Sequence, residues 1–212
     1  MPPATPLIVV RLGGSLLNLP TLHTQLHQLT QLLLPARILI ITGGGRAADS
    51  IRQLDNSLKL PAKITHWQAI AAMSSNAQLL VRTGNALKSA RDHESAQNAW
   101  EDHCTPVLDV HTWLLGPGKT TADSLPESWQ VTSDSIAAAV ATAWQSSRLV
   151  LAKSCPPPAL NVHELAAAGA VDQHFPTAAH NLMIDWCCLR HSSSPKIVHI
   201  LPQNISPSTT AS

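Results

Sequence analysis

The chain has 212 residues, of which 44% are hydrophobic and 13% charged, and its formal net charge is +1. This composition is typical of a globular protein and argues against a disordered chain. The lack of a long basic run argues against a nucleic-acid groove or an anionic membrane surface as partner. No apolar stretch reaches the roughly 18–20 residues of a membrane span, and the N-terminus lacks the basic region of a signal peptide. We therefore expect a cytoplasmic protein with reduced thiols.

The apolar pattern predicts strands that alternate with helices along the chain. Short β-branched runs indicate strands, whereas leucines or alanines at helical spacing, bounded by proline, glycine or a polar cap, indicate helices. In the first half of the chain the predicted elements are a strand at Leu7–Val10, a helix bounded by Pro20-Thr21 and Pro35, a strand at Ile38–Ile41, and helices from Ala47 to Leu58 and from Ile64 to Leu87. A strand at Pro106–Val110 follows, and then a loop with little regular structure from Thr112 to Trp129. The last predicted elements are a helix at Ser135–Gln145 capped by Thr132–Asp134, a strand at Arg148–Ala152, a helix at Val162–Ala168, and two strands within Leu182–Leu189 and Lys196–Leu201.

The predicted strands are apolar on both faces. Such strands, alternating with helices, predict an α/β fold in which a mostly parallel sheet is covered by helices on both sides. No linker divides the chain, so we expect residues 1–201 to form a single domain and residues 202–212 to be a flexible tail.

Two of the strand–helix connections are glycine turns, Gly13-Gly14-Ser15 and Gly43-Gly44-Gly45. A glycine turn before a helix exposes backbone N–H groups at the positive end of the helix dipole, which favours phosphate binding. Two consecutive turns at one sheet edge suit a phosphate donor that faces a phosphate acceptor.

Other interpretations of the glycines fit less well. The segment GGGRAA, residues 43–48, satisfies the looser dinucleotide fingerprint, but no acidic residue ends a strand about 20 residues later. The segment GPGKTT, residues 116–121, resembles a phosphate-binding P-loop, but Trp113 stands where that motif needs glycine.

Several segments together resemble the amino acid kinase family of aspartate, glutamate and uridylate kinases. They are VVRLGGSLL, ITGGGRAAD, HWQAIAAMSSNAQLL, SLPESWQVTSDSIAAAVA and LVLAKS, and the resemblance runs from about Leu7 to Phe175. It implies a three-layer αβα sandwich and phosphoryl transfer from ATP with Mg²⁺. The short length and the AAAGAVDQHFP segment look most like a compact branch that includes the aminomethylfuran-methyl-phosphate kinase of methanofuran biosynthesis, and relatives linked to tetrahydromethanopterin-dependent one-carbon metabolism.

The resemblance also implies roles for individual residues. The first glycine turn faces the donor phosphates, the second faces the acceptor, and the aspartate of the T-S-D segment organises the catalytic cations. The predicted catalytic residues are Arg11, Asp134 and Lys153; the predicted nucleotide- or phosphate-binding residues are Gly13, Gly14, Ser15, Ser133 and Ser154; the predicted acceptor-binding residues are Gly43, Gly44, Gly45, Arg46 and His66.

The sequence departs from the family pattern at two places. Arg11 stands where the family has lysine, which keeps the charge but replaces a point charge with a planar, bidentate group. Lys153-Ser154 is followed by Cys155 and three prolines instead of the usual Asp-Gly of the nucleotide pocket. We interpret Trp129 as a packing residue.

Two hypotheses therefore stay open. The first is an ATP- and Mg²⁺-dependent kinase for a small anionic acceptor, a phosphomonoester or a carboxylate. The second is a degenerate kinase fold that binds a nucleotide or phosphorylated metabolite without turnover. A dinucleotide oxidoreductase is a third and weaker reading.

Two further expectations concern metals and assembly. His23 with His27, and Cys187-Cys188 with His191, lack standard metal-ligand spacing, so no metal site is predicted. The alanine- and serine-rich segment His66–Leu80 predicts a homodimer or higher homo-oligomer through helix packing.

Overall fold

The computed structural model describes residues 5–146, 148–190 and 195–201; the predicted tail at 202–212 and His191 lie outside them. Within these ranges seven strands form one sheet, in the order β3-β4-β2-β1-β5-β6-β7. The strands are β1 (Leu7–Leu12), β2 (Arg37–Thr42), β3 (Leu87–Ala90), β4 (Thr105–Leu108), β5 (Arg148–Lys153), β6 (Met183–Cys188) and β7 (Ile197–Ile200). All neighbours are parallel except β6 and β7, which are antiparallel. The predicted α/β fold with a mostly parallel sheet is confirmed.

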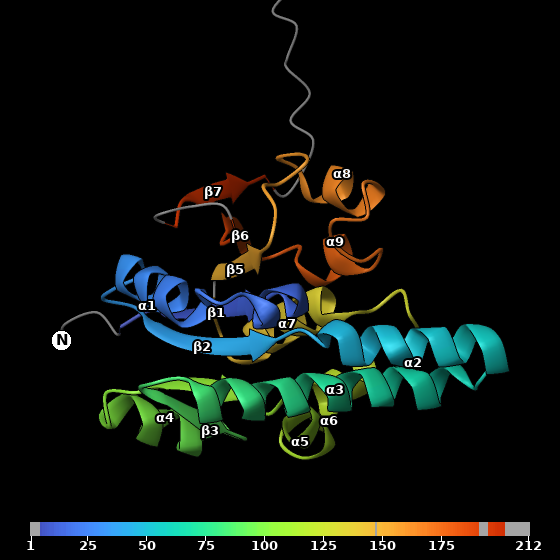
Figure 1. Cartoon of the computed structure of the whole chain (residues 1–212), viewed down its shortest axis with the longest axis horizontal. Helices are drawn as coiled ribbons and strands as arrows, with labels where there is room; N and C mark the ends of the chain where they lie inside the picture. The colour runs from blue at the N-terminus through green and yellow to red at the C-terminus, as the bar shows by residue number, and fades with distance from the viewer. Residues whose placement is uncertain (1–4, 147, 191–194, 202–212) are drawn as a thin grey trace, which may run out of the picture.

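Helices cover both faces of the sheet (Figure 1). They are η1 (Gly14–Asn18, a 3-10 helix), α1 (Leu22–Leu32), α2 (Gly45–Leu58), α3 (Ala62–Thr83), α4 (His93–Glu101), α5 (Val110–Leu115), α6 (Lys119–Ser124), α7 (Ser133–Ala143), α8 (Val162–Ala167) and α9 (Phe175–Ala178). One core lies under η1 and α1, and the other lies under α5, α7, α8 and α9. Helix α3 contributes to both cores, through Ile70 and Met73 to one and through Ala77 and Leu80 to the other.

Strand alternation explains how an arginine reaches the interior. Successive side chains of a strand point to opposite faces. Ile8, Val10 and Leu12 enter the core under α1, whereas Val9 enters the core that contains α7. Arg11 has the same parity as Val9 and lies at the carboxyl end of β1, so its side chain points toward the N-terminus of α7.

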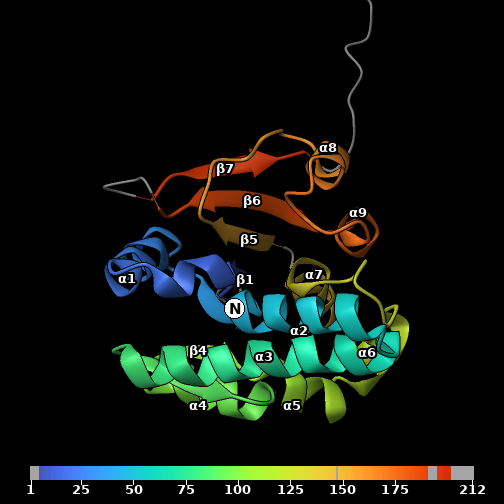
Figure 2. The ribbon, with the colours of Figure 1, turned by 45° about the vertical axis from the view of Figure 1, so that its right-hand side comes forward.

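Helices α2 and α3 lie side by side and extend beyond the sheet (Figures 1 and 2). Helix α2 contains no buried residue and packs chiefly against α3. Its exposed leucines, Leu54 and Leu58, lie toward its C-terminal end. The pair therefore forms a projecting wall next to the second glycine turn, from which α2 starts.

The middle of the chain differs from the prediction. The predicted loop from Thr112 to Trp129 is wrong, because α5 and α6 occupy much of it. The predicted strand at Pro106–Val110 is also wrong at its end: Asp109 accepts a hydrogen bond from the Thr112 N–H (3.1 Å) and caps α5 instead. The helix predicted to reach Leu87 ends at Thr83, because Gly84 is extended and Leu87 begins β3.

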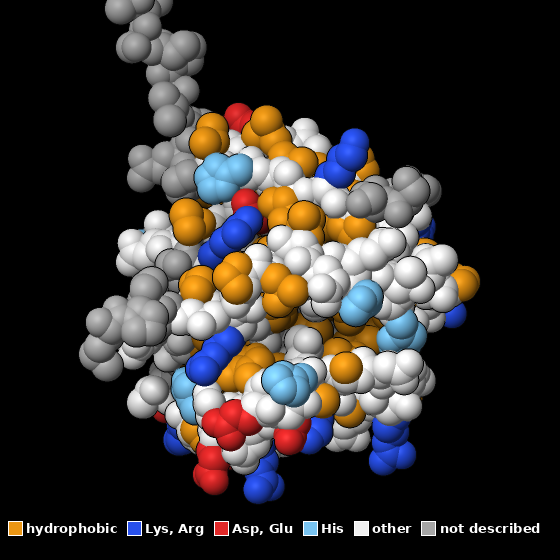
Figure 3. All heavy atoms as spheres, turned by 90° about the vertical axis from the view of Figure 1, so that its left-hand side faces the viewer, with side chains coloured by type: hydrophobic (Ala, Val, Ile, Leu, Met, Phe, Trp, Pro, Cys, Tyr) orange, Lys and Arg blue, Asp and Glu red, His pale blue; other side chains and the backbone are white. Residues whose placement is uncertain are grey.

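The surface features bear on possible partners. On the face shown in Figure 3, Lys and Arg side chains lie at separate points among apolar and His side chains. Among the described residues on this face, the Lys and Arg side chains therefore do not gather into one basic patch. Within the described ranges, no helix combines the length and apolar character needed to cross a membrane.

Candidate functional site

The two glycine turns meet backbone to backbone at the carboxyl edge of the sheet. A Cβ atom placed on Gly14 would lie 2.2 Å from the Gly45 nitrogen, and one on Gly43 would lie 2.8 Å from the Gly14 nitrogen. Gly45 also has a positive φ of 53°, which favours glycine. We call this contact, formed by Gly13–Ser15 and Gly43–Gly45, the glycine junction. No side chain larger than hydrogen fits between its two turns.

Within the described part of the chain, the glycine junction has N–H donors without a backbone acceptor. The first N–H of each turn is used by the sheet: Gly13 donates to the Ala152 carbonyl and Gly43 to the Leu12 carbonyl, both at 2.8 Å. The next residues begin η1 and α2, and the first N–H groups of a helix have no partner within it. Such groups at the positive end of a helix dipole suit phosphate oxygens.

Three charged side chains converge beside the glycine junction. Asp134, on the first turn of α7, is buried and pairs with Arg11 Nε through Oδ1 (3.0 Å) and with Lys153 Nζ through Oδ2 (2.9 Å). Arg11 Nη2 also donates to Ser133 Oγ (2.6 Å). We call Arg11, Asp134 and Lys153 the charge cluster. It holds two cations against one carboxylate, so it carries a net positive charge.

The Arg11 guanidinium lies between the two glycine turns. A Cβ on Gly13 would lie 3.3 Å from its Nη1, and a Cβ on Gly43 would lie 3.1 Å from its Nη2. The planar group therefore occupies space that only glycine leaves open on both sides.

Burial and pairing shift the pKa values of the charge cluster. Burial alone would raise the pKa of Asp134, but the charges of Arg11 and Lys153 outweigh burial and lower it below its usual value. Burial, followed by repulsion from Arg11, lowers the pKa of Lys153 to about 8. Asp134 is therefore ionised at neutral pH, while Lys153 loses its proton at a mildly alkaline pH.

A loop from the C-terminal part of the chain supports the charge cluster. Asp172 accepts hydrogen bonds from the N–H and hydroxyl groups of both Thr132 and Ser135, at 2.5–3.1 Å. It thereby caps α7, whose N-cap residue Thr132 makes no side-chain cap of its own. The Ala170 carbonyl accepts a bond from Lys153 Nζ (2.9 Å). Sequence reasoning missed Asp172, because it lies 37 residues or more from the residues it caps.

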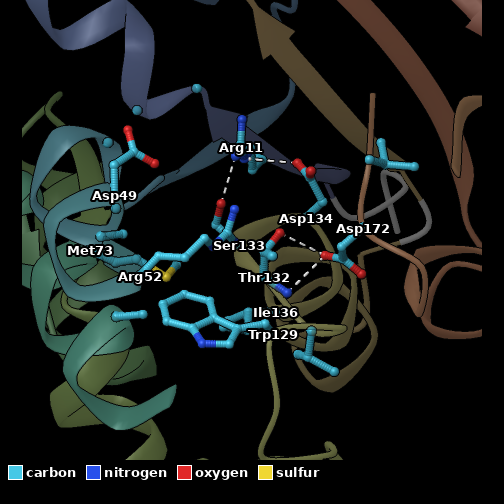
Figure 4. A pocket seen from close by; sticks show the side chains of 18 of the residues that line it. Arg11, Asp49, Arg52, Met73, Trp129, Thr132, Ser133, Asp134, Ile136 and Asp172 are labelled. Carbon is cyan, nitrogen blue, oxygen red and sulfur yellow. Dashed lines mark hydrogen bonds and ion pairs between the residues drawn. The ribbon is translucent and has the colours of Figure 1, made fainter. Parts of the chain in front are cut away.

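The glycine junction and the charge cluster line one cavity of about 490 Å³. Figure 4 shows Arg11, Ser133 and Asp134 on its upper and right sides, with the indole of Trp129 below them. Among the predicted residues, the cavity is lined by Arg11, Gly13, Gly14, Ser15, Gly44, Gly45, His66, Ser133, Asp134 and Lys153. Most of the predicted positions are thus brought together in one place.

Three predicted residues lie elsewhere or at the margin. Arg46 lines a separate cavity of about 330 Å³, behind the glycine junction, together with Asn76 and Leu79. Ser154 lies beside the first glycine turn, where its hydroxyl oxygen accepts a hydrogen bond from the Ser15 hydroxyl (3.2 Å). Gly43 is held in position by Asn76 of α3, whose Nδ2 donates a hydrogen bond to the Gly43 carbonyl (2.7 Å).

The predicted acceptor residue His66 lies in the cavity wall. Its side chain comes from the N-terminal half of α3 and is buried, and burial lowers its pKa. The His66 ring is therefore a neutral hydrogen-bonding group at physiological pH.

The cavity wall formed by α2 and the segment before α7 contains residues that the sequence did not indicate. Asp49 and Arg52 project from α2, and Trp129 comes from the segment before α7. Trp129, interpreted from sequence as a packing residue, is half-buried and lies in the cavity wall. Nothing in the local pattern of α2 distinguishes Arg52 from a solvated helix residue.

The geometry can be compared with known proteins. Residues 6–156, more than half of the chain, match the amino acid kinase family. The chain belongs to the amino acid kinase family. No curated protein matches this kinase-family chain significantly in sequence.

Solved structures of kinases share the fold of this family member. Uridylate kinase from Archaeoglobus fulgidus is 15% identical, with 84% of this chain and 89% of that chain covered and a TM-score of 0.56. UMP kinase from Ureaplasma parvum is 14% identical, with 92% and 99% covered and a TM-score of 0.57. Aspartate kinase from Synechocystis is 14% identical, with 93% of this chain but 40% of that chain covered, and a TM-score of 0.60.

Proposed function

We propose that this protein is a phosphotransferase that transfers the γ-phosphoryl group of ATP, with Mg²⁺, to a small anionic acceptor. The observation that carries the proposal is the position of the charge cluster, which lies against the glycine junction inside one cavity. Phosphoryl transfer needs little covalent participation by the protein. It needs donors and positive charge placed around the moving group before the reaction starts.

Each part of the site has a role in that transfer. Arg11 and Lys153 stabilise the negative charge on the equatorial oxygens of the phosphoryl group in the transition state, and Asp134 holds the two cations in position. The N–H groups of the first turn bind the donor phosphates, and those of the second turn bind the acceptor. A carboxylate or phosphomonoester acceptor is already deprotonated at neutral pH, so the reaction requires no general base.

The donor set of this chain fits a metal that arrives with the nucleotide. The described residues contain no group of three or more His, Cys, Asp or Glu side chains able to hold a metal ion. Asp134 is already paired with two cations. Mg²⁺ usually keeps several waters and binds through one or two carboxylates together with substrate phosphates. ATP would therefore carry the Mg²⁺, which neutralises phosphate charge, while Gly14 and Ser15 contact the phosphates.

The acceptor is proposed to be a phosphomonoester or carboxylate of low molecular weight. The sequence resemblance to the compact branch supports aminomethylfuran-methyl phosphate, or a related intermediate of methanofuran- or tetrahydromethanopterin-linked metabolism, as a first candidate. The lining of the acceptor side by charged, aromatic and apolar side chains is compatible with a small ring that bears charged substituents.

Transfer of labelled phosphate from ATP tests the proposal. We expect γ-labelled ATP and Mg²⁺ to label an acceptor in a panel of small carboxylates and aminofuran phosphates. The retained ability to bind ATP without any transfer or hydrolysis would instead support the binding-only alternative, which Arg11 motivates. Arg11→Lys separates the two: loss of transfer identifies arginine as the working residue, whereas a large gain indicates a decayed site.

We also propose that the chain self-associates through the outward face of α3. The small residues Ala72, Ser74 and Ala77 pack inside the protomer, so a partner would contact the exposed Gln68, Ser75 and Leu79 instead. Sedimentation velocity measures the oligomeric state of the wild type and of Leu79→Asp, and we expect the substitution to weaken the association. A monomeric wild type would contradict the proposal.

A further inference from the structure

We propose that a second ligand site lies behind the glycine junction, binds a small carboxylate with an apolar body, and is linked to the cavity of the charge cluster. The site is the cavity of about 330 Å³ that Arg46 lines. We call it the rear cavity, and the cavity of the charge cluster the main cavity. The volume of the rear cavity lies at the low end of the range for small-molecule pockets. The carboxylate site itself does not depend on the proposed kinase activity.

The rear cavity is formed by three elements that meet at the glycine junction. One side is η1 with the residues after it, another is the first turn of α2, and the third is the C-terminal half of α3. Much of the lining is apolar: Leu22 and Leu80 belong to the buried core, and Leu17 and Leu19 are half-buried against it. Such a lining favours a ligand with a hydrocarbon body.

The charge of the rear cavity indicates an anion. Among the described residues that line it, Arg46 carries the permanent charge and none is acidic. The Arg46 side chain is exposed, and within the described part of the chain it makes no ion pair or hydrogen bond. The neutral polar side chains of Asn76 and Thr83 lie in the same lining. One cation balances one negative charge, and the planar guanidinium matches a carboxylate, so the site suits a monoanionic carboxylate better than a dianionic phosphate.

The third cavity of the described structure provides a contrast. It has a volume of about 660 Å³ and is lined mainly by α1 and by residues between the end of α3 and the start of β3. None of its described lining residues is Lys, Arg, Asp or Glu. This larger cavity therefore offers no permanent charge to orient an ion, whereas the rear cavity combines an apolar lining with one free cation.

The rear cavity and the main cavity share backbone. Gly14 and Gly45 line both, and their turns meet without an intervening side chain. Asn76, which lines the rear cavity, donates to the Gly43 carbonyl (2.7 Å). A ligand that contacts Gly14 and Gly45 from behind therefore favours the arrangement of the two turns in this structure. Because the same arrangement presents N–H groups to the main cavity, we expect each site to strengthen ligand binding at the other.

Binding of simple acids tests the carboxylate site. Ligand-observed NMR titration, which detects weak binding, would compare acetate, butyrate and hexanoate with neutral hexanamide and with butyl phosphate. We expect affinity to rise about fourfold for each methylene group that enters the cavity, and hexanoate to bind about tenfold more tightly than hexanamide. Arg46→Met should abolish the preference for the acid over the amide. The matched control is Arg82→Met, an exposed arginine of α3 that lines none of the described cavities, and it should retain the preference.

Binding of ATP with Mg²⁺ tests the linkage and locates the acid. At saturating hexanoate we expect ATP to bind about fivefold more tightly to the wild type and to Arg82→Met, but not to Arg46→Met. Unchanged ATP affinity would overturn the linkage, and displacement of hexanoate by ATP would place the acid in the main cavity and overturn the site. Absence of saturable binding, equal binding of hexanoate and hexanamide, or a preference for butyl phosphate would also overturn it. A wild type that binds hexanoate through Arg46 but never binds ATP would leave the carboxylate site standing and remove the kinase function.

Discussion

The cavity has two walls that are built on different physical principles. At the glycine junction, backbone meets backbone, and the shape depends on the absence of side chains at Gly14 and Gly43. At the charge cluster, three charged side chains meet in a buried place, and the geometry depends on the attraction of two cations to one carboxylate. The first wall is therefore sensitive to volume and insensitive to pH, whereas the second is sensitive to charge. The substitutions below each test one of the two walls, and each is paired with a control outside the cavity.

Asp134→Asn is expected to have the largest effect, because it leaves two buried cations without a counter-charge. Breaking a buried ion pair typically costs about 3–5 kcal/mol. We expect the free energy of unfolding, measured by chemical denaturation, to fall by that order, and phosphoryl transfer to be lost. Asp185→Asn is a matched control, since Asp185 is also buried and paired, with Arg148 Nε at 2.5 Å, but lies outside the cavity. Asp185→Asn should destabilise the protein without weakening ATP binding. Full turnover in Asp134→Asn would refute the role of the charge cluster.

The next prediction uses pH to probe the same wall. The pKa of Lys153 is about 8 in the folded protein, against 10.5 for an ordinary lysine. Between these values the unfolded chain binds the proton that the folded protein releases. The contribution of Lys153 to the free energy of unfolding should therefore rise with pH from about 8 to 10.5, by roughly 3 kcal/mol, and stay constant below pH 8.

The measurement is a difference between wild type and Lys153→Met across that pH range. Burial raises the pKa of Cys187 to about 11, so its thiol acts in the opposite direction above pH 9, where the folded protein keeps a proton that the unfolded chain releases. That contribution is common to both proteins and cancels in the difference. A flat difference between pH 8 and 10.5 would show that Lys153 is not buried beside Arg11.

The sequence predicted the sheet and its edge better than the surroundings of the site. The apolar strands and both glycine turns are local patterns, and residues such as Arg11 and Asp134 come to the cavity because parallel strands share one carboxyl edge. Strand β3 was missed because two of its four residues, Lys88 and Ser89, are exposed and give no apolar run. The short helices α5 and α6 were missed because Gly116, Pro117 and Gly118 separate them and leave each only six residues long.

Residues that act across long sequence separations were beyond sequence reasoning. The start of α7 was recognised from its polar residues, but the cap comes from Asp172 rather than from Thr132. Arg52 and Trp129 meet only because the segment before α7 folds back over α2. Such contacts depend on tertiary packing, which leaves no periodic signal in the chain.

Gly14→Ala breaks the first wall by volume alone. A methyl group there would lie 2.2 Å from the Gly45 nitrogen, and backbone cannot rotate away as a side chain can. We expect a loss of about 1–3 kcal/mol in the free energy of unfolding, the usual cost of overpacking, together with loss of ATP binding. Gly116→Ala is the control, because its nearest atom would be 3.4 Å away, and it should change stability by less than about 0.5 kcal/mol. Normal ATP affinity in Gly14→Ala would show that the two turns can separate without consequence.

Asp172→Ala gives the smallest expected loss of stability and acts on the charge cluster from outside it. Loss of a helix N-cap typically costs about 0.5–2 kcal/mol. Asp109→Ala removes a comparable cap, at α5, and should destabilise the protein by a similar amount. Only Asp172 also fixes the turn that carries Ser133 and Asp134, so only Asp172→Ala should slow phosphoryl transfer beyond its effect on stability.

The kinetic pattern distinguishes positioning by Asp172 from simple stabilisation. Because Asp172 acts through Asp134 and contributes charge that raises the pKa of Lys153, its removal should move the alkaline limb of the rate profile to lower pH. Asp172→Glu, which restores the charge, should recover part of that shift, and Asp109→Ala should leave the limb in place. If Asp172→Ala and Asp109→Ala share one pH profile, the loop that carries Asp172 supports the fold only, and the charge cluster is organised by α7 and β5 alone.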